Sequence, residues 1–321
     1  MNILVTGGAG YIGSTTVKRL LENGHTITVF DNLVYGHEDA VNCELIKGNL
    51  EDKEFLFTSL AGKKFDAVVH FAAYAQAGES VQNPYKYFYS NITGGLNLLE
   101  YMVKEEIKYI IFSSTCAIFG TPDPLPVTEK STKHPESPYG ESKLMFEKIL
   151  EWYDKIHAIK HINLRYFNAA GAGLDGDLGE RHEPETHIIP IAIEVARGKR
   201  EKFSLFGTDY PTKDGTCIRD YIHIEDLAIG HIQALEYIMN ENKSDSFNLG
   251  TGNGYSNREV IDMVKKVSGV DFTVEENEKR AGDPPMIYAD NTKARETLGF
   301  IPKYSDLQTI VESAWKWHEK H

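Results

Sequence analysis

The feature that most constrains this chain is its opening stretch, a short apolar segment followed at once by closely spaced glycines. Residues 2–6 form an apolar run of the length of a buried strand, and Gly7, Gly10 and Gly13 precede a helical pattern. Glycine lets the backbone turn tightly and approach a ligand without a Cβ in the way, and the free N–H groups of a helix N-terminus favour phosphate. The stretch therefore predicts a strand, a phosphate-binding turn and a helix.

An acid after the second strand indicates which phosphate compound binds. Residues 26–30 read as a strand, and Asp31 follows at about the distance at which dinucleotide-binding folds place a carboxylate on the ribose hydroxyls. A carboxylate there disfavours the extra phosphate of NADP. The glycines alone would fit an ordinary turn, but with the acid they predict NAD, bound by a G-x-x-G-x-x-G variant of the commoner motif.

Strands and helices then alternate through the first half of the chain. Further strands are predicted at residues 44–47, 66–71, 109–113 and 161–167, with helices at about 52–60, 84–103 and 139–157. Such alternation is typical of a parallel sheet covered on both faces, and right-handed crossovers give it a doubly wound order. We therefore expect an α/β (Rossmann) fold with ligands at the carboxyl ends of the strands.

The chain of 321 residues is long for a single core, and its composition changes after residue 167. Residues 168–187 are polar, glycine-rich and without periodicity, as in a functional or disordered loop. We predict a dinucleotide-binding domain over residues 1–167 and a smaller C-terminal α/β substrate domain over residues 168–321, with residues 219–241 returning to pack on the first.

Charge and cysteine content exclude several classes of partner. The formal net charge of −13 argues against nucleic acid, and no stretch approaches the roughly 18 apolar residues of a membrane span. Cys43, Cys116 and Cys217 are odd in number and far apart, which disfavours a disulfide or structural-zinc framework. We expect a cytoplasmic protein without a membrane or nucleic-acid partner.

A tyrosine and a lysine at helical spacing are candidates for proton transfer. Tyr139 and Lys143 share one helix face, and Ser114 and Thr115 follow the strand predicted before that helix. An ammonium beside a phenol favours the phenolate, so Tyr139 could act as a base below the usual pKa of about 10. Such a pair alone is more often a feature of a solvated helix face; its setting in a dinucleotide-binding fold favours chemistry.

Longer motifs place these residues in a known family. TGGAGYIG at residues 6–13, SST at 113–115 and YGESK at 139–143 together resemble the extended short-chain dehydrogenase/reductase superfamily. Within it, the chain is similar to the UDP-glucose 4-epimerases through motifs spread over nearly its whole length: DNL (31–33), HFAA (70–73), GES (78–80), RYFNAAGA (165–172), PETHIIP (184–190), DYPTKDGTCIRDYIHIEDLA (209–228), NLGTG (248–252) and RAGDPP (280–285). The long central motif is far more specific than the glycine turn.

The resemblance implies an isomerase that interconverts UDP-glucose and UDP-galactose, with bound NAD reduced and reoxidised in each turnover. Tyr139 would take the proton of the sugar C4 hydroxyl, leaving a 4-keto sugar. Lys143 would hold Tyr139 anionic and bind the nicotinamide ribose, and Thr115 would hydrogen-bond the same sugar oxygen. The intermediate would turn over within a pocket that grips the nucleotide firmly and the sugar loosely.

The resemblance also implies two sets of binding residues. NAD would be held by Gly7, Gly10, Tyr11, Ile12, Gly13, Asp31, Asn32, Asn49, Leu50, Phe71, Ala72, Ala73, Ser113, Tyr139, Lys143 and Tyr166. The UDP-sugar would be held by Thr115, Asn91, Asn168, His187, Phe206, Arg219, Arg280, Asp283 and Ile287. Ser113 and Tyr166 would flank the nicotinamide, and the guanidinium forks of Arg219 and Arg280 suit a diphosphate.

Departures from the family's patterns separate related activities. Sugar-nucleotide dehydratases and decarboxylases carry acids near the strand-end threonine, whereas Cys116 and Ala117 follow Thr115 here, which favours epimerisation. Ile287 lies where residue size sets the room for a sugar C2 substituent. Epimerases of UDP-N-acetylglucosamine, UDP-xylose or UDP-glucuronate therefore stay open as alternatives. A non-catalytic NAD sensor on the same scaffold is less favoured, because the Tyr139–Lys143 pair is intact.

Two apparent metal sites are rejected on spacing, and a dimer is expected. His182 and His187, with Glu180, Glu183 and Glu185 nearby, lack the i, i+4 spacing of a helical zinc pair, so we predict no metal. The segment 175–177 lacks the twelve-residue pattern of a calcium loop. By resemblance, the long helices around 84–103 and 139–157 pack as the four-helix interface of a homodimer.

Overall fold

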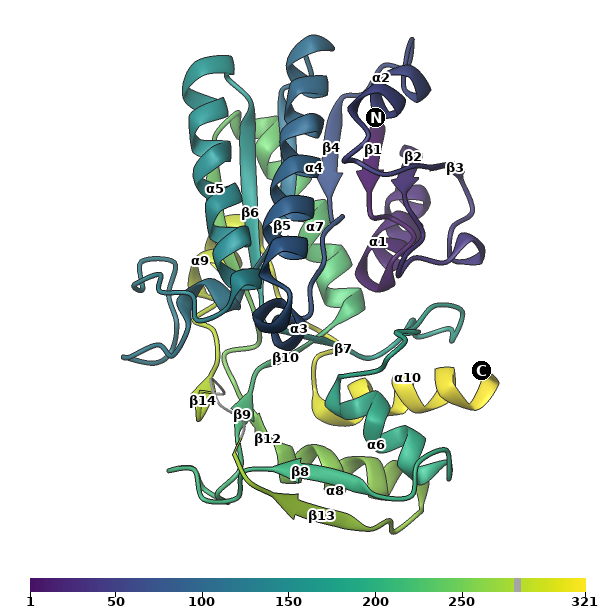
Figure 1. Ribbon diagram of the computed structural model, residues 1–321, viewed down its shortest axis with the longest axis vertical. Helices are drawn as coiled ribbons and strands as arrows, with labels where there is room; N and C mark the ends of the chain where they lie inside the picture. Colours follow the sequence, from purple (N-terminus) through teal and green to yellow (C-terminus); the bar gives the residue numbers. More distant parts are fainter. Residues whose placement is uncertain (280–283) are drawn as a thin grey trace.

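A seven-stranded parallel sheet forms the larger part of the molecule (Figure 1), in the order β11-β6-β5-β4-β1-β2-β3. The computed structural model describes residues 1–279 and 284–321. The strands of this sheet are β1 (Asn2–Thr6), β2 (Thr26–Asp31), β3 (Glu44–Lys47), β4 (Ala67–His70), β5 (Tyr109–Thr115), β6 (Lys160–Tyr166) and β11 (Asp245–Leu249). The predicted doubly wound α/β fold is confirmed.

Helices cover both faces of this sheet. One face carries α1 (Tyr11–Glu22), α7 (Ile224–Glu241) and α9 (Thr292–Leu298), and the other carries α2 (Lys53–Ser59), α4 (Pro84–Lys104) and α5 (Pro138–His157). Two of these helices begin with the same local signal, a capping side chain followed by proline: Asn83 accepts from the N–H of Lys86, and Ser137 accepts from the N–H of Gly140. Because the helices cover the faces of the sheet, the carboxyl ends of its strands stay open for a site.

The chain returns to the large sheet after an excursion into a second domain. Helix α7 packs against α1, and β11 then adds to the sheet edge, pairing Asp245 with Ile162 of β6. The sequence predicted that residues 219–241 pack on the first domain, but it assigned the segment that forms β11 to the second domain. The structure adds β11, because its buried residues Phe247 and Leu249 complete the core on that face.

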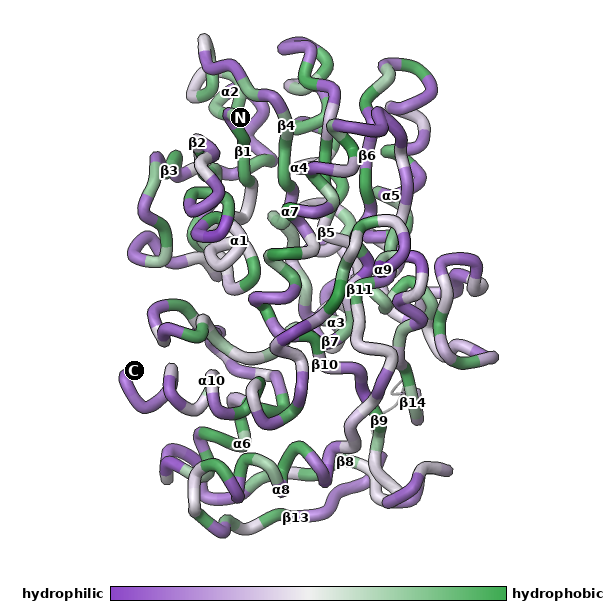
Figure 2. Tube along the Cα trace, turned by 180° about the vertical axis from the view of Figure 1, so that it is seen from behind, coloured by the Kyte–Doolittle hydropathy of each residue, from purple (hydrophilic) through white to green (hydrophobic). Residues whose placement is uncertain are grey.

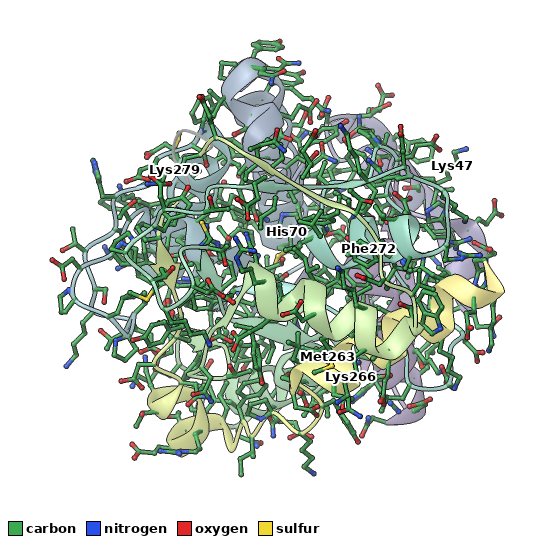
Figure 3. All side chains as sticks on the ribbon, turned by 90° about the horizontal axis from the view of Figure 1, so that it is seen from below. Lys47, His70, Met263, Lys266, Phe272 and Lys279 are labelled. Atoms are coloured by element: carbon green, nitrogen blue, oxygen red, sulfur yellow. The ribbon has the colours of Figure 1, made fainter. Side chains whose placement is uncertain are left out.

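A smaller domain packs below the sheet in Figure 1. It contains helices α6 (Ile188–Ala196), α8 (Asn257–Ser268) and α10 (Leu307–Lys320) and the parallel strands β8 (Phe203–Phe206) and β13 (Val274–Asn277). Their apolar faces form a separate core, and Figure 2 shows the hydrophobic segments of α6 and α8 facing one another. In Figure 3, Met263 of α8 and Phe272, which follows this helix, are labelled on opposite sides of its ribbon, while His70 of β4 lies near the middle of the projection.

Short pairings connect the two domains. Strand β7 (Asn168–Ala170) pairs with β10 (Tyr221–His223), and β9 (Ile218–Arg219) lies between β12 (Tyr255–Ser256) and β14 (Met286–Ile287). The remaining short elements are α3 (Ala77–Gln82), η1 (Glu38–Ala40) and η2 (Cys116–Phe119). Within the part of the chain described, no helix has both the length and the apolar character that crossing a membrane requires.

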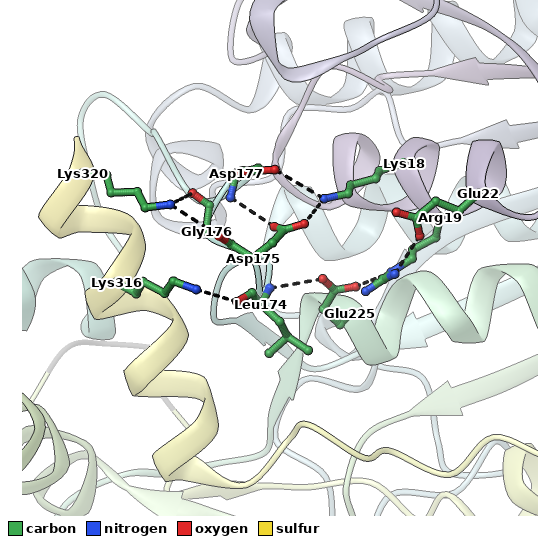
Figure 4. Close-up of polar contacts among 10 residues, drawn as sticks. All are labelled: Lys18, Arg19, Glu22, Leu174, Asp175, Gly176, Asp177, Glu225, Lys316 and Lys320. Carbon is green, nitrogen blue, oxygen red and sulfur yellow. Dashed lines mark hydrogen bonds and ion pairs between the residues drawn. The ribbon is translucent and has the colours of Figure 1, made fainter.

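Charged contacts fix the first half of the loop between β7 and α6 (Figure 4). Lys18 of α1 pairs with Asp175, so this acid, which sequence analysis rejected as a calcium ligand, contacts a lysine. Glu225 of α7 accepts from Arg19 Nε at 2.7 Å and from the N–H of Leu174 at 3.4 Å. The loop predicted to be functional or disordered is thus tied to two helices of the large domain.

Candidate active site

The glycine turn is built for close backbone approach. Gly7 has a φ of +72°, and a Cβ there would lie 2.5 Å from the backbone nitrogen of Ala72. A Cβ on Gly13 would lie 2.2 Å from the carbonyl oxygen of Gly7, whereas one on Gly10 would meet that oxygen only at 3.4 Å. Gly7 and Gly13 are therefore required by the protein's own packing, and Gly10 leaves room at the N-terminus of α1, where its lack of a side chain suits a phosphate.

A small cavity of about 130 Å³ lies beside this turn at the ends of β2 and β4. Asp31 is nearly buried in its wall and accepts hydrogen bonds from the N–H groups of Ala9 (3.0 Å) and Leu33 (2.8 Å). Burial raises the pKa of its carboxyl group. Predicted cofactor residues that line this cavity are Gly7, Asp31, Asn32, Asn49, Leu50, Phe71, Ala72 and Ala73.

A central cavity of about 460 Å³ continues from the small one, and the two share Gly7, Phe71 and Ala73. The further predicted residues in its wall are Tyr11, Ile12, Gly13, Ser113, Thr115, Tyr139, Lys143, Tyr166, Asn168, His187, Arg219 and Ile287. Residues from both domains thus meet at the carboxyl ends of β1, β4, β5 and β6, where a doubly wound sheet places its ligand. Two adjoining cavities along these strand ends suit a molecule with two linked parts, such as a dinucleotide.

Tyr139 and Lys143 lie one turn apart at the start of α5. Lys143 Nζ donates to the carbonyl oxygen of Ser113 at 2.8 Å and lies 4.9 Å from the centre of the Phe112 ring. Burial raises the pKa of Tyr139 to about 12, partly offset by a hydrogen bond with Thr115. Burial lowers the pKa of Lys143 to about 7.

These pKa shifts correct one expectation. The spacing predicted that Lys143 would lower the pKa of Tyr139, but the pKa of the phenol is raised. The reason is that Lys143 is buried and Tyr139 is largely shielded from water, and desolvation disfavours the charged form of each group. Positive charge in the cavity would therefore favour ionisation of Tyr139.

Ser113 and Tyr166 lie side by side because β5 and β6 are neighbouring strands. The register pairs Thr115 with Tyr166, and the hydroxyl groups of Ser113 and Tyr166 share a short hydrogen bond. Burial raises the pKa of Tyr166. Both hydroxyls belong to the cavity wall opposite the glycine turn.

Asn91 lies in a different place from the other predicted substrate residues. It lines the small cavity, and its amide is already engaged: Oδ1 accepts from the N–H of Tyr74 at 2.9 Å, and Nδ2 donates to the carbonyl of Tyr74 and to Ser142. In the structure it therefore fixes the loop after β4. Its contact with a substrate stays a prediction.

An outer cavity of about 470 Å³ adjoins the central one and shares Asn168, His187 and Arg219 with it. Phe206, at the end of β8, lies in its wall. Arg219 Nη1 donates to the carbonyl oxygens of Ile218 (2.9 Å) and Pro284 (2.8 Å), which holds the side chain at the junction. The predicted residues Arg280 and Asp283 lie outside the described residues.

Sequence analysis missed several lining residues. Tyr35 and Tyr74 line the small cavity, and Arg200 and Lys202 line the outer one. Tyr74 directly follows the HFAA motif, so its place after a strand end was a usable signal. Arg200 and Lys202 reach the cavity from the connection between α6 and β8, which no motif marks.

The residues rejected as a metal site converge in space. Donor atoms of Glu180, His182, Glu185 and His187 all lie within 4.8 Å of one another, while Glu183 is exposed. The charge of Glu180 raises the pKa of His187 to about 9. Burial alone would raise the pKa of Glu180, but the two histidines outweigh it and lower that pKa to about 2. Spacing along the chain does not report this convergence, and the prediction of no metal stays a prediction.

Comparison with known proteins agrees with this geometry. The profile of the NAD dependent epimerase/dehydratase family matches residues 3–250. A UDP-glucose 4-epimerase of Lactobacillus helveticus is 48% identical over 100% of this chain and 98% of its own length. A crystal structure of UDP-glucose 4-epimerase from Brucella ovis in complex with NAD is 44% identical, with a TM-score of 0.94 over 98% of this chain and 97% of that one. The UDP-Glc/GlcNAc 4-epimerase of Campylobacter jejuni is also 44% identical, with a TM-score of 0.87 over 100% of this chain and 99% of that one.

Proposed function

The chain belongs to the NAD-dependent epimerase/dehydratase family, and from this premise we propose how its residues invert C4 of a UDP-hexose. Its activity is that of an NAD-dependent epimerase that interconverts UDP-glucose and UDP-galactose, in keeping with its full-length similarity to UDP-glucose 4-epimerases. The observation that carries the mechanism is the meeting of Tyr139, Lys143 and Thr115 in a cavity continuous with the glycine turn.

The chain fits the cofactor on grounds of its own geometry. Gly7 and Gly13 leave no room for a Cβ, Gly10 leaves the start of α1 open, and the Asp31 carboxylate lies in the adjoining small cavity. When bound, NAD supplies the acceptor and donor of the C4 hydride and, when oxidised, a positive charge that favours the Tyr139 phenolate. The remaining catalytic work falls to side chains of the central cavity.

Tyr139 is the proposed base and acid. It takes the proton from the C4 hydroxyl as the sugar becomes a 4-keto compound, and returns the proton when C4 is reduced from the opposite face. Thr115, which hydrogen-bonds Tyr139, would also hydrogen-bond the C4 oxygen. Lys143, held by the carbonyl of Ser113, places its ammonium in the same buried wall and so offsets part of the cost of a phenolate there.

The nucleotide would be held at the outer cavity and the sugar only loosely in the central one. Arg219 lies where the two cavities join, which suits the diphosphate, and Phe206 offers an aromatic face beyond it. Asn168 and His187 lie at the same junction. A hexose anchored only through its nucleotide can turn over between proton and hydride transfers.

The direct test is conversion of UDP-galactose by purified protein without added NAD. We expect UDP-glucose to form, because cofactor that is reoxidised in each turnover is not consumed. Removal of bound NAD should abolish the conversion and its return should restore it. Failure of the protein to form UDP-glucose, together with failure of substrate to reduce bound cofactor, would overturn the proposal.

A second substrate, UDP-N-acetylglucosamine, is favoured by one residue and one relative. Ile287 lies in the wall of the central cavity beside Cys116, and a 44% identical relative is named for both substrates. Shortening the side chain should make room for an acetamido group, and enlarging it should remove that room. Ile287→Ala should therefore raise kcat/KM for the N-acetylated sugar relative to UDP-glucose, and Ile287→Tyr should lower it; an unchanged ratio in both variants would contradict this role.

We also propose a homodimer, formed through α4 and α5. Large apolar side chains are exposed on these two neighbouring helices, including Tyr85 (73%), Trp152 (60%) and Ile156 (67%). Exposed apolar patches of this kind support a protein interface. Light scattering should give twice the chain mass, and Trp152→Glu should give the monomer mass.

The three free cysteines support a cytoplasmic location, which remains a proposal. Cys43, Cys116 and Cys217 are all unpaired, and burial raises the pKa of the Cys116 thiol to about 12, which makes it a poor nucleophile. A reducing compartment keeps such thiols intact. Fractionation of the native cell is the measurement that decides it.

A further inference from the structure

The second half of the loop between β7 and α6 gathers two carboxylates and two imidazoles. Glu180 Oε1 lies 2.8 Å from Nδ1 of His182, and Nδ1 of His187 reaches the same oxygen. Glu185 Oε1 lies 3.7 Å from Nδ1 of His187. Both ring nitrogens therefore point at the same oxygen of Glu180, and the Glu185 carboxylate lies beside His187.

Backbone and side-chain contacts fix the segment that carries this cluster. Trp317 Nε1 donates to the carbonyl oxygen of Glu180 at 3.2 Å. Arg181 turns away and makes a two-pronged contact with Asp39, at 3.0 and 2.7 Å. The N–H of His187 donates to Glu185 Oε1 at 2.8 Å. The segment is thus held by Trp317 of α10, by Asp39 of η1 and by a hydrogen bond within the cluster.

We propose that Glu180, His182, Glu185 and His187 bind a divalent transition-metal ion of the zinc class. Two imidazole nitrogens and two carboxylate oxygens are a donor set that zinc accepts in tetrahedral geometry, whereas calcium and magnesium prefer oxygen alone. The four donor atoms lie within 4.8 Å of one another, whereas the donors around a tetrahedral zinc are roughly 3.4 Å apart. Side-chain rotation would have to bring the wider pairs closer and to separate Glu180 Oε1 from the two histidine nitrogens, and the double charge of the ion offsets the two acids.

The position of the site indicates a structural role. His182 lies edge-on to Tyr11, with ring centres 6.2 Å apart, and Tyr11 at the start of α1 donates to the carbonyl of Gly171 at the start of the same loop. An ion pair already ties the first half of the loop to α1, and a hydrogen bond from the Leu174 N–H to Glu225 ties it to α7. An ion in the second half would fix the loop against the glycine turn and hold His187 at the wall of the central cavity.

The alternative is that the cluster binds no metal ion and that His187, as an imidazolium, pairs with Glu180. The two states differ in a way that can be measured without an activity assay. Untagged holoenzyme, loaded with zinc and dialysed, should retain about one equivalent by elemental analysis. Cobalt added to metal-free holoenzyme should give the visible absorption of a tetrahedral site.

Matched variants assign the ion to this cluster. His182→Ala and Glu185→Gln each remove one donor and should lower zinc affinity at least tenfold in calorimetric titration, whereas Glu183→Gln, an exposed acid in the same loop, should bind as wild type does. Retention below about 0.1 equivalent with no cobalt absorption, or equal affinity in all three variants, would overturn the proposal. Neither readout uses epimerase activity, so the metal site and the mechanism can fail separately.

Discussion

The cofactor end and the nucleotide-sugar end of this site are assembled in different ways. At the cofactor end, the glycine turn, Asp31 and Phe71 follow the carboxyl ends of β1, β2 and β4, three strands of one sheet. At the other end, Asn168, Phe206 and Arg219 come from strands of three separate small sheets. A shared sheet makes the first end rigid and local in sequence, whereas the second depends on how two domains pack.

Tyr139 lies where the two ends meet, and its loss should have the largest effect. Tyr139→Phe removes the proton acceptor but keeps the ring, so we expect kcat to fall by about 1,000-fold or more while NAD stays bound. Tyr153→Phe, further along the same helix, is the control and should leave kcat unchanged. Retained turnover in the first variant would assign the base to another residue.

The sequence predicted the cofactor end better because its signals are local. The apolar run at residues 2–6 coincides with β1, since a strand buried in a parallel sheet needs little more than apolar residues, and the short run at 44–47 coincides with β3 at the edge of the sheet. By contrast, β9 and β14 have two residues each and carry no periodicity, and α3 has little apolar character because its sequence is AGESVQ. These elements form only because the domains pack around them.

The chemistry of single residues shows the same limit. The spacing of Tyr139 and Lys143 correctly indicates a shared helix face, but their pKa shifts depend on burial, which no local pattern reports. Likewise, the amide of Asn91 is engaged by Tyr74, a partner supplied by the path of the loop after β4. Convergence of Glu180 with His187 depends on the loop path in the same way.

A buried carboxylate at each end of the site allows the stability of the two ends to be compared by mutation. Glu147 pairs with Arg165 (2.7 Å, each side chain 4% exposed) and accepts from Ser114, joining α5 to β5 and β6. Glu147→Gln should lower the free energy of unfolding by about 3–5 kcal/mol, because it leaves a buried guanidinium unpaired. Urea denaturation measures this.

The counterpart at the nucleotide-sugar end is Asp220, between β9 and β10. Its carboxylate accepts from the N–H groups of Thr251, Gly252 and Ala289 and from the Thr251 hydroxyl. Asp220→Asn should cost about 1–3 kcal/mol, since an amide cannot accept all of these bonds but leaves no unpaired charge. If this loss equals or exceeds that of Glu147→Gln, the rigid sheet is not the more strongly specified end.

Substitutions at two glycines of the turn distinguish a role in packing from a role in ligand binding. Gly13→Ala should destabilise the protein by about 1–3 kcal/mol and remove NAD, because its Cβ would lie 2.2 Å from the carbonyl oxygen of Gly7. Gly10→Ala meets that oxygen at 3.4 Å, so thermal unfolding should change little while the NAD dissociation constant rises at least tenfold. If both variants change thermal stability and the NAD dissociation constant to the same extent, the backbone of the turn is not adapted for close contact with a ligand.

A pH-dependent effect concerns the charge of Lys143 in the wall between the two ends. Its pKa is about 7 in the folded protein, well below the value of about 10.4 for an exposed lysine, so between these values the unfolded state binds more protons and stability rises with pH. Relative to Lys143→Met, NAD-free wild type should therefore gain up to about 1.4 kcal/mol of unfolding free energy per pH unit from pH 7 to 9. Lys148→Met, on the exposed face of the same helix, is the matched control, and its difference from wild type should stay flat. A flat difference for Lys143→Met as well would mean that the ammonium keeps its charge in the folded wall. In that case Tyr139 would need less help from the cofactor to ionise, and the junction would be more polar than its burial indicates.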